Sequence, residues 1–139
     1  KLDVLPLNAG ILGFSSEWFK EAWAHPQKIR LEERIIDTIS PVYLIASKLA
    51  AFENRGNQDF WMSHDLEDLI TVIDGRENIV DEIRHSKADV REYISYTLRG
   101  YLDNTDFIQA LPAYLDSDPA SQERLPSLRH KINGVVQLM

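Results

Sequence analysis

From residue 40 onward, apolar residues recur at intervals of three and four, the spacing that places them on one face of an α-helix. The first run begins after Ser40, a favoured N-cap, opens with Pro41 and ends at Gly56. The second run lies between Ser63, another capping residue, and Gly75. These start and stop signals predict two consecutive helices with defined ends.

The helical spacing continues towards the end of the chain. It predicts a third helix over 77–85, a fourth over 90–102 and a fifth over 105–115. A last helix is expected to start at Pro119 and to be kinked or restarted at Pro126, because proline lacks the backbone N–H that a helix interior needs. The pattern therefore indicates a helical bundle from residue 40 onward.

The N-terminal part of the chain has a different pattern. Residues 2–5 alternate apolar and polar side chains, which predicts a short strand. A short helix that carries Trp18 and Trp23 is expected next. Residues 28–31 and 34–39 are predicted to pair as two strands around a turn. The front of the chain is thus expected to be a small β element.

These patterns together predict an α+β fold that is predominantly helical. The small N-terminal β element would have two to three short strands, followed by a bundle of about five to six helices. A length of 139 residues is the usual size of one domain. We therefore expect residues 1–139 to form a single domain, with the β-containing part over 1–39 and the helical part over 40–139.

The composition narrows the class of protein. The chain is 44% hydrophobic and contains no cysteine, which indicates a packed core without disulfides or thiolate metal sites. It has no run of about 18 apolar residues and no signal-peptide pattern, so we expect a cytoplasmic protein without a membrane association. Fifteen basic and 22 acidic residues give a net charge of −7, which argues against broad nucleic-acid binding through phosphate neutralisation.

Two cationic residues occur where the first predicted helix should be apolar. On a helical wheel with about 100° per residue, Lys48 and Arg55 lie about 20° apart, within the arc that also holds Leu44 and Phe52. A cation carried into a core needs a partner, because uncompensated burial of a charge costs several kcal/mol. The pattern therefore predicts acidic partners for both side chains.

The next predicted helix offers such partners. Asp65 borders the apolar arc of that helix, and Asp68 lies further out. We hypothesise a polar cluster of Lys48, Arg55, Asp65 and Asp68 at the junction of the two helices. The alternative is that the long cationic side chains reach solvent and form ordinary surface pairs.

The same residues carry a resemblance to a known family. The segment PVYLIASKLAAFENRG over 41–56, followed by SHDLEDLI over 63–70, resembles the AbiEii-type nucleotidyltransferase family. In that family a Lys on one helix, an Arg about two turns later and an Asp-x-x-Asp on the next helix follow the catalytic strands. The residues that match this spacing are Lys48, Arg55, Asp65 and Asp68. The likeness extends over roughly residues 1–85, and the later helices fit only loosely.

The resemblance implies roles for these residues. The opening strand looks like the one that carries the third catalytic carboxylate, so Asp3 would be that residue and a ligand of Mg²⁺. Lys48 and Arg55 would neutralise phosphate charge, since phosphoryl-type transfer is catalysed by positioning and charge stabilisation. Asp65 would orient Lys48 or contact the nucleotide or acceptor, and Asp68 would support the cluster.

The resemblance also implies an activity and partners. The family is best known for toxins of bacterial toxin–antitoxin and phage-defence systems. Such proteins would transfer a nucleotide from a nucleoside triphosphate (NTP) to an RNA or protein acceptor, with two Mg²⁺ ions clamping the attacking and leaving oxygens. An antitoxin protein would be a further partner.

The sequence departs from the family pattern in front of Asp3. The Gly-Ser or Gly-Gly turn that grips the triphosphate should precede this residue, as should an Asp-x-Asp pair that binds most of the metal, and neither is found in front of it. A single carboxylate cannot hold two Mg²⁺ ions. We therefore expect the chain to be the C-terminal portion of a nucleotidyltransferase-like protein that binds no metal tightly and is inactive alone.

Two other classes of function fit parts of the sequence. The first is a non-catalytic helical interaction module or a gene remnant. The three tryptophans, Trp18, Trp23 and Trp61, are expected to pack in the core or against another domain, but any of them that is exposed would serve an interaction module as a contact surface. A His/Asp metal-dependent phosphohydrolase would use His64 and Asp65, but no further histidine has a suitable ligand spacing. The simpler interpretation of His64 is a helix N-terminal residue beside the cap that supports the cluster.

Overall fold

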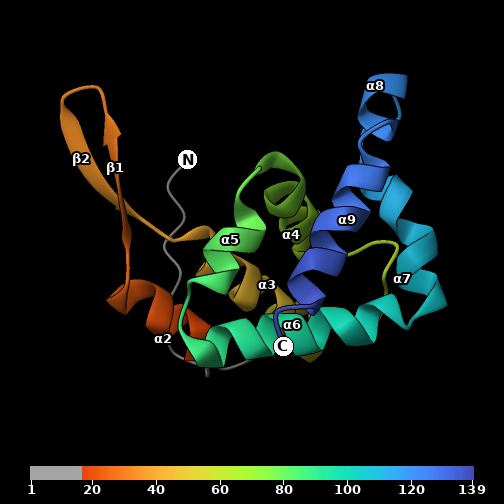
Figure 1. Ribbon diagram of the computed structural model, residues 1–139, viewed down its shortest axis with the longest axis horizontal. Coiled ribbons are helices and arrows are strands. Elements are labelled where there is room, and N and C mark those ends of the chain that lie inside the picture. The colour runs from red at the N-terminus through yellow and green to blue at the C-terminus, as the bar shows by residue number, and fades with distance from the viewer. Residues whose placement is uncertain (1–16) are drawn as a thin grey trace.

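The computed structural model describes residues 17–139 as a predominantly helical α+β structure (Figure 1), which confirms the predicted fold class. The strand predicted over 2–5, with Asp3, lies outside these residues. In chain order the elements are α2 (Glu17–Ala24), β1 (Gln27–Leu31), β2 (Arg34–Thr38), α3 (Pro41–Arg55), α4 (His64–Gly75), α5 (Ile79–Arg84), α6 (Ala88–Leu102), α7 (Thr105–Ala110), the 3₁₀ helix η1 (Leu111–Tyr114), α8 (Pro119–Gln122) and α9 (Leu125–Val136).

Strands β1 and β2 form the predicted antiparallel hairpin, which projects away from the helical part of the molecule (Figure 1). Ile29 pairs with Ile36 in the ladder, and Lys28 forms a 2.8 Å ion pair with Asp37. Most of the hairpin is exposed, including Ile35 with 70% of its surface accessible. An isolated two-stranded sheet is only marginally stable, so this hairpin contributes little to the core.

The two helices with the clearest sequence signals begin at the predicted residues. The Ser40 hydroxyl accepts a hydrogen bond from the Tyr43 backbone N–H, and the Ser63 hydroxyl accepts one from that of Leu66. Each cap satisfies a backbone donor that has no partner within its helix. At the other end of α3, the Gly56 N–H donates to the Phe52 carbonyl, which closes the helix.

Helix α3 is the centre of the hydrophobic core. It packs against α2, α4 and α6, and Ile45, Leu49 and Phe52 on its inner face are almost completely buried. Leu66 and Leu69 of α4 are buried against the same core. Burying each side chain of this size stabilises the fold by about 1.5–3 kcal/mol, so the α3–α4 contact is held firmly.

Helix α9 packs against α4, α5 and α6. The ammonium group of Lys131 donates to the carbonyl oxygens of Ile73 and Asp74 at the end of α4, at 3.1 and 2.7 Å. These carbonyls lack partners within the helix, and a cation there also favours the helix dipole. On the other side, the buried Ser95 hydroxyl of α6 donates to the Val135 carbonyl at 2.9 Å.

The fifth predicted helix is interrupted in the structure. The fifth was expected to run over 105–115, but α7 ends at Ala110 and continues as the 3₁₀ helix η1. Pro112 accounts for this change, because it cannot donate an α-helical hydrogen bond and its ring crowds the preceding turn. The last helix is restarted next to Pro126, as predicted, which leaves α8 as a single turn.

Over residues 17–139, none of the helices combines the length and apolar character needed to cross a bilayer.

Candidate functional site

The predicted polar cluster is present at the junction of α3 and α4. The Lys48 ammonium nitrogen lies 3.3 Å from Asp65 Oδ1 and 2.5 Å from Asp68 Oδ2. Arg55 Nε donates to Asp65 Oδ2 and Arg55 Nη2 to Asp65 Oδ1, both at 3.1 Å. These four side chains, hereafter the ion-pair cluster, bring the two cations of α3 onto one carboxylate of α4.

Burial differs strongly among the members of the ion-pair cluster. The Asp65 side chain is 10% exposed and that of Lys48 24%, whereas Arg55 and Asp68 are both more than half exposed. Asp65 is therefore the buried centre, and Arg55 is the more exposed of the two cations. Two cations face two carboxylates, so the formal charge of the ion-pair cluster is zero.

The Arg55–Asp65 contact has the geometry of a strong ion pair. Two parallel N–H···O hydrogen bonds join the guanidinium to both carboxylate oxygens, an arrangement that fixes the orientation of both groups. Asp65 also lies in the first turn of α4, where the helix dipole favours a negative charge. The Asp65 side chain thus orients Arg55 and Lys48 together.

The connection between α3 and α4 is itself well anchored. The carboxylate of Asp59 accepts hydrogen bonds from the backbone N–H groups of Trp61 and Met62. The Phe60 ring is buried, and its carbonyl accepts a 2.6 Å hydrogen bond from the Tyr114 hydroxyl. These contacts fix the distance between the end of α3 and the start of α4, and with it the Arg55–Asp65 geometry.

The sequence predicts two further site residues, His64 and Asp3. His64 has a 96% exposed side chain, and its ring nitrogen Nδ1 lies 3.1 Å from Glu67, away from the ion-pair cluster. Its placement at the first position of α4 agrees with the interpretation as a residue beside the cap. Asp3 lies outside the described residues, so its predicted role as a third carboxylate stays a prediction.

The Mg²⁺ implied by the family resemblance does not fit the described part of the chain. Across residues 17–139, there is no group of three or more His, Asp or Glu side chains placed to hold a metal ion. Asp65 and Asp68 are instead engaged by Lys48 and Arg55. We therefore assign no chemical step to a metal held by these residues, and the phosphohydrolase alternative gains no ligand set from them.

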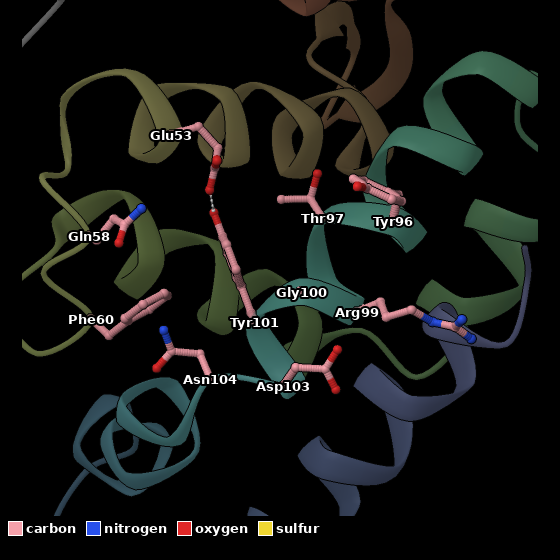
Figure 2. A pocket seen from close by; sticks show the side chains of 10 residues that line it. All are labelled: Glu53, Gln58, Phe60, Tyr96, Thr97, Arg99, Gly100, Tyr101, Asp103 and Asn104. Atoms are coloured by element: carbon pink, nitrogen blue, oxygen red, sulfur yellow. Dashed lines mark hydrogen bonds between the residues drawn. The ribbon is translucent and has the colours of Figure 1, made fainter.

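A second feature was missed by the sequence reasoning. A pocket of about 390 Å³ lies between α3 and α6, and Glu53 and Tyr101 meet across it (Figure 2). The Tyr101 hydroxyl donates to Glu53 Oε1 at 2.5 Å. The sequence pattern indicated only that Tyr101 belongs to the bundle core. Glu53 carries no signal of its own, since it falls among the exposed residues of α3.

An aromatic cluster forms the wall behind this pocket. The rings of Phe52, Phe60, Tyr101 and Phe107 lie with centroids 5.1–5.7 Å apart, mostly in tilted or edge-to-face arrangements. Burial raises the pKa of Tyr101 strongly, and its hydrogen bond to Glu53 raises it further. The phenol is therefore held in its neutral form as a hydrogen-bond donor to the Glu53 carboxylate.

The three tryptophans have different environments. Trp18 packs against the core with its ring 5.1 Å from that of Tyr93. Trp23 is 79% exposed and Trp61 48% exposed. The expectation of a packed tryptophan is thus confirmed for Trp18, while the other two present much of their surface to solvent.

Comparisons with known proteins leave the family unassigned. No protein-family model, curated protein or solved structure matches this chain. The resemblance to the AbiEii-type nucleotidyltransferases therefore depends on the spacing of the four cluster residues and the segments around them.

Proposed function

We propose that the chain is part of a nucleotidyltransferase-like protein, in which the ion-pair cluster binds the phosphates of a nucleoside triphosphate. The observation that carries the proposal is the buried carboxylate of Asp65, which holds Lys48 and Arg55 side by side. Two cations oriented by one carboxylate are suited to a polyanionic ligand. The same four positions carry the family resemblance.

Within this proposal, the two cations have different tasks. Arg55 is 55% exposed and would contact the incoming phosphates directly. Lys48 is held between Asp65 and Asp68, and Asp68 is exposed enough to move away when phosphate oxygens replace it. Asp65 would stay in place and act as the positioning residue for both cations. The acceptor, an RNA or a protein, and an antitoxin partner belong to the proposal through the resemblance alone.

The proposed transfer also needs groups that the ion-pair cluster does not supply. The sequence holds no Gly-Ser turn followed by an Asp-x-Asp pair, and residues 17–139 contain no group of three or more His, Asp or Glu side chains placed to hold Mg²⁺. We therefore expect the purified 139-residue chain to bind an NTP weakly and to transfer no nucleotide. Incubation with radiolabelled ATP, CTP, GTP or UTP together with RNA and protein acceptors should leave the acceptors unlabelled.

The binding part of the proposal can be tested by calorimetric titration with ATP. Arg55→Met should weaken binding by about tenfold or more, as expected for loss of a charge-assisted contact. The matched control is Arg129→Met, which removes an exposed arginine of α9 that is not part of the ion-pair cluster. This variant should bind ATP like the wild type. Absence of saturable ATP binding to the wild-type chain, or equal binding by both variants, would sink the proposal.

A second candidate function is a non-catalytic interaction module. It is favoured by the exposed apolar side chains of Trp23, Leu31 and Ile35, which lie on α2 and the hairpin. The titration with ATP separates the two candidates, because an interaction module has no need of NTP binding. In that case the ion-pair cluster would serve only to join α3 to α4.

A further inference from the structure

The pocket between α3 and α6 is separate from the ion-pair cluster. Glu53 lies about 140° around α3 from Lys48, so the two sites use different faces of the same helix. The volume of about 390 Å³ falls in the range of small-ligand sites. We call it the Glu53 pocket.

Glu53 has unused hydrogen-bonding capacity in this pocket. Its Oε1 accepts the short hydrogen bond from Tyr101, and Oε2 accepts none from residues 17–139. The aromatic cluster holds Tyr101 in place from behind. Tyr101 fixes the orientation of the carboxylate through Oε1, so Oε2 can accept hydrogen bonds from the N–H groups of a ligand.

The charges around the pocket favour a cationic ligand. Glu53 and Asp103 are acidic, and among residues 17–139 Arg99 is the single basic residue that lines the pocket. Figure 2 shows the Arg99 guanidinium extending away from the Glu53–Tyr101 pair. The net charge of −7 over the whole chain also attracts cations.

The rim of the pocket provides a flat surface and a strained loop. Tyr96 is 74% exposed at one side, where its ring is accessible to a planar or aliphatic group. On the other side, Gln58 has a positive φ angle of 56°, a conformation that side-chain-bearing residues rarely adopt. Backbone strain of this kind concentrates at binding sites, which agrees with a ligand-binding role for the rim.

We propose that the Glu53 pocket binds an organic cation, namely a guanidinium or primary ammonium group, which donates to Glu53 Oε2 and packs against Tyr96. A guanidinium fits best, because it is planar, donates several N–H groups in fixed directions and stacks on aromatic rings. The cation comes either from a small metabolite or from an arginine side chain of a polypeptide. This inference does not depend on the proposed nucleotidyltransferase function.

The test is a titration of the ¹⁵N-labelled chain, followed by NMR, with N-acetyl-L-arginine methylamide. Saturable shifts are expected at the amides of Gln58, Tyr96 and Gly100, which line the pocket. The isosteric N-acetyl-L-citrulline methylamide, which lacks the charge, should bind about tenfold more weakly or not at all. A parallel titration with free L-arginine identifies the source: tighter binding of the blocked compound indicates a polypeptide side chain, and tighter binding of free arginine indicates a metabolite.

Three variants test the chemistry of the site. Glu53→Gln should weaken binding by about tenfold or more, as expected for loss of a charge-assisted hydrogen bond. Glu92→Gln is the matched control. It removes an exposed carboxylate that lies on α6 outside the pocket, and it should leave binding unchanged. Tyr101→Phe keeps the Glu53 charge but removes the hydrogen bond that orients the carboxylate, so binding should weaken less than in Glu53→Gln. Equal affinity for the citrulline compound, shifts confined to other residues, or unchanged affinity in Glu53→Gln would overturn the proposal.

Discussion

Asp65 is the residue on which the ion-pair cluster depends. Its carboxylate is shared by Lys48 and Arg55, and it is the most buried of the charged side chains there. Removing the shared buried carboxylate takes away the common partner of two neighbouring cations, which costs more than losing an exposed pair. The stability contribution of the cluster should therefore be concentrated in Asp65 and Lys48.

Stability measurements on single variants can check this distribution. We expect Asp65→Asn to lower the free energy of unfolding by about 1–3 kcal/mol, less than for a fully buried pair because Arg55 is half exposed. Lys48→Met should change it by more than about 0.5 kcal/mol, beyond the usual surface range. Urea denaturation gives both values.

The matched control is Lys28→Met, which breaks the exposed ion pair with Asp37. Its free energy of unfolding should differ from that of the wild type by no more than about 0.5 kcal/mol. A Lys48→Met effect as small as that of the control would contradict a buried cluster.

Buried tyrosines, among them Tyr93 and Tyr101, contribute stability that is lost at alkaline pH. Burial and the nearby Glu53 charge raise the pKa of Tyr93 from 10.0 to about 12, and burial raises that of Tyr101 as well. A raised pKa means that the folded state keeps its proton longer than the unfolded state. The contribution to stability is therefore complete below pH 10 and is lost as the pH rises towards 12.

Denaturation curves at several pH values between 9 and 12 should show this loss, with a steeper decline in the wild type than in Tyr93→Phe. The phenylalanine variant has no proton to release at this position, so the difference between the two proteins isolates Tyr93 from the titrating lysines. Parallel pH profiles for wild type and variant would show that Tyr93 has the same pKa in the folded and unfolded states.

At the scale of elements, the turn after α3 couples the helix end to the core. Gly56 has an ordinary helical φ of −76°, so its role is one of space and not of conformational freedom. A Cβ at this position would lie 2.4 Å from Phe52 Cδ2 and 2.7 Å from the Phe52 carbonyl oxygen. Neither atom can move easily, because Phe52 is buried in the aromatic cluster and its carbonyl accepts the hydrogen bond that ends α3.

A pair of glycine substitutions separates this steric effect from helix propensity. Gly56→Ala should destabilise the chain by about 1–3 kcal/mol, the cost of inserting a methyl group into a packed region. Gly100→Ala, inside α6 with no atom within 4 Å of the added Cβ, should stabilise it by up to about 1 kcal/mol. Thermal melting of both variants provides the comparison. Opposite signs are expected, and a neutral Gly56→Ala would show that Phe52 can shift without cost.

At the scale of the whole molecule, stability is unevenly distributed. The buried residues belong chiefly to α3, α4, α6 and α9, whereas the hairpin β1–β2 lies outside this core and is mostly exposed (Figure 1). A segment with few buried apolar contacts opens without unfolding the rest of the protein. The helical part should therefore behave as one cooperative unit, with the hairpin opening independently.

Native-state hydrogen exchange measures this difference directly. Amides of β1 and β2 should exchange by local opening, with protection far below that of the inner turns of α3 and α6. The latter should exchange only through global unfolding, so their protection should fall in Asp65→Asn while that of the hairpin stays the same. Hairpin amides as protected as those of α3 would mean that the hairpin is part of the cooperative core.

Much of the fold and the ion-pair cluster was predictable from local sequence signals. Periodicity and capping residues located α3 and α4, because hydrogen bonding and side-chain spacing within a helix depend only on neighbouring residues. Helical geometry also placed Lys48 and Arg55 on the apolar face, and burial of charge required an acidic partner on the next helix. Asp65 fulfils that requirement.

Only the tertiary structure decided the Glu53 pocket. Glu53 and Tyr101 are separated by 48 residues, and in the sequence one resembles an ordinary surface glutamate and the other a core aromatic. Their contact exists because α3 and α6 pack side by side around the aromatic cluster. Local patterns state which face of a helix is buried, whereas the pairing of two faces depends on how all the helices share one core.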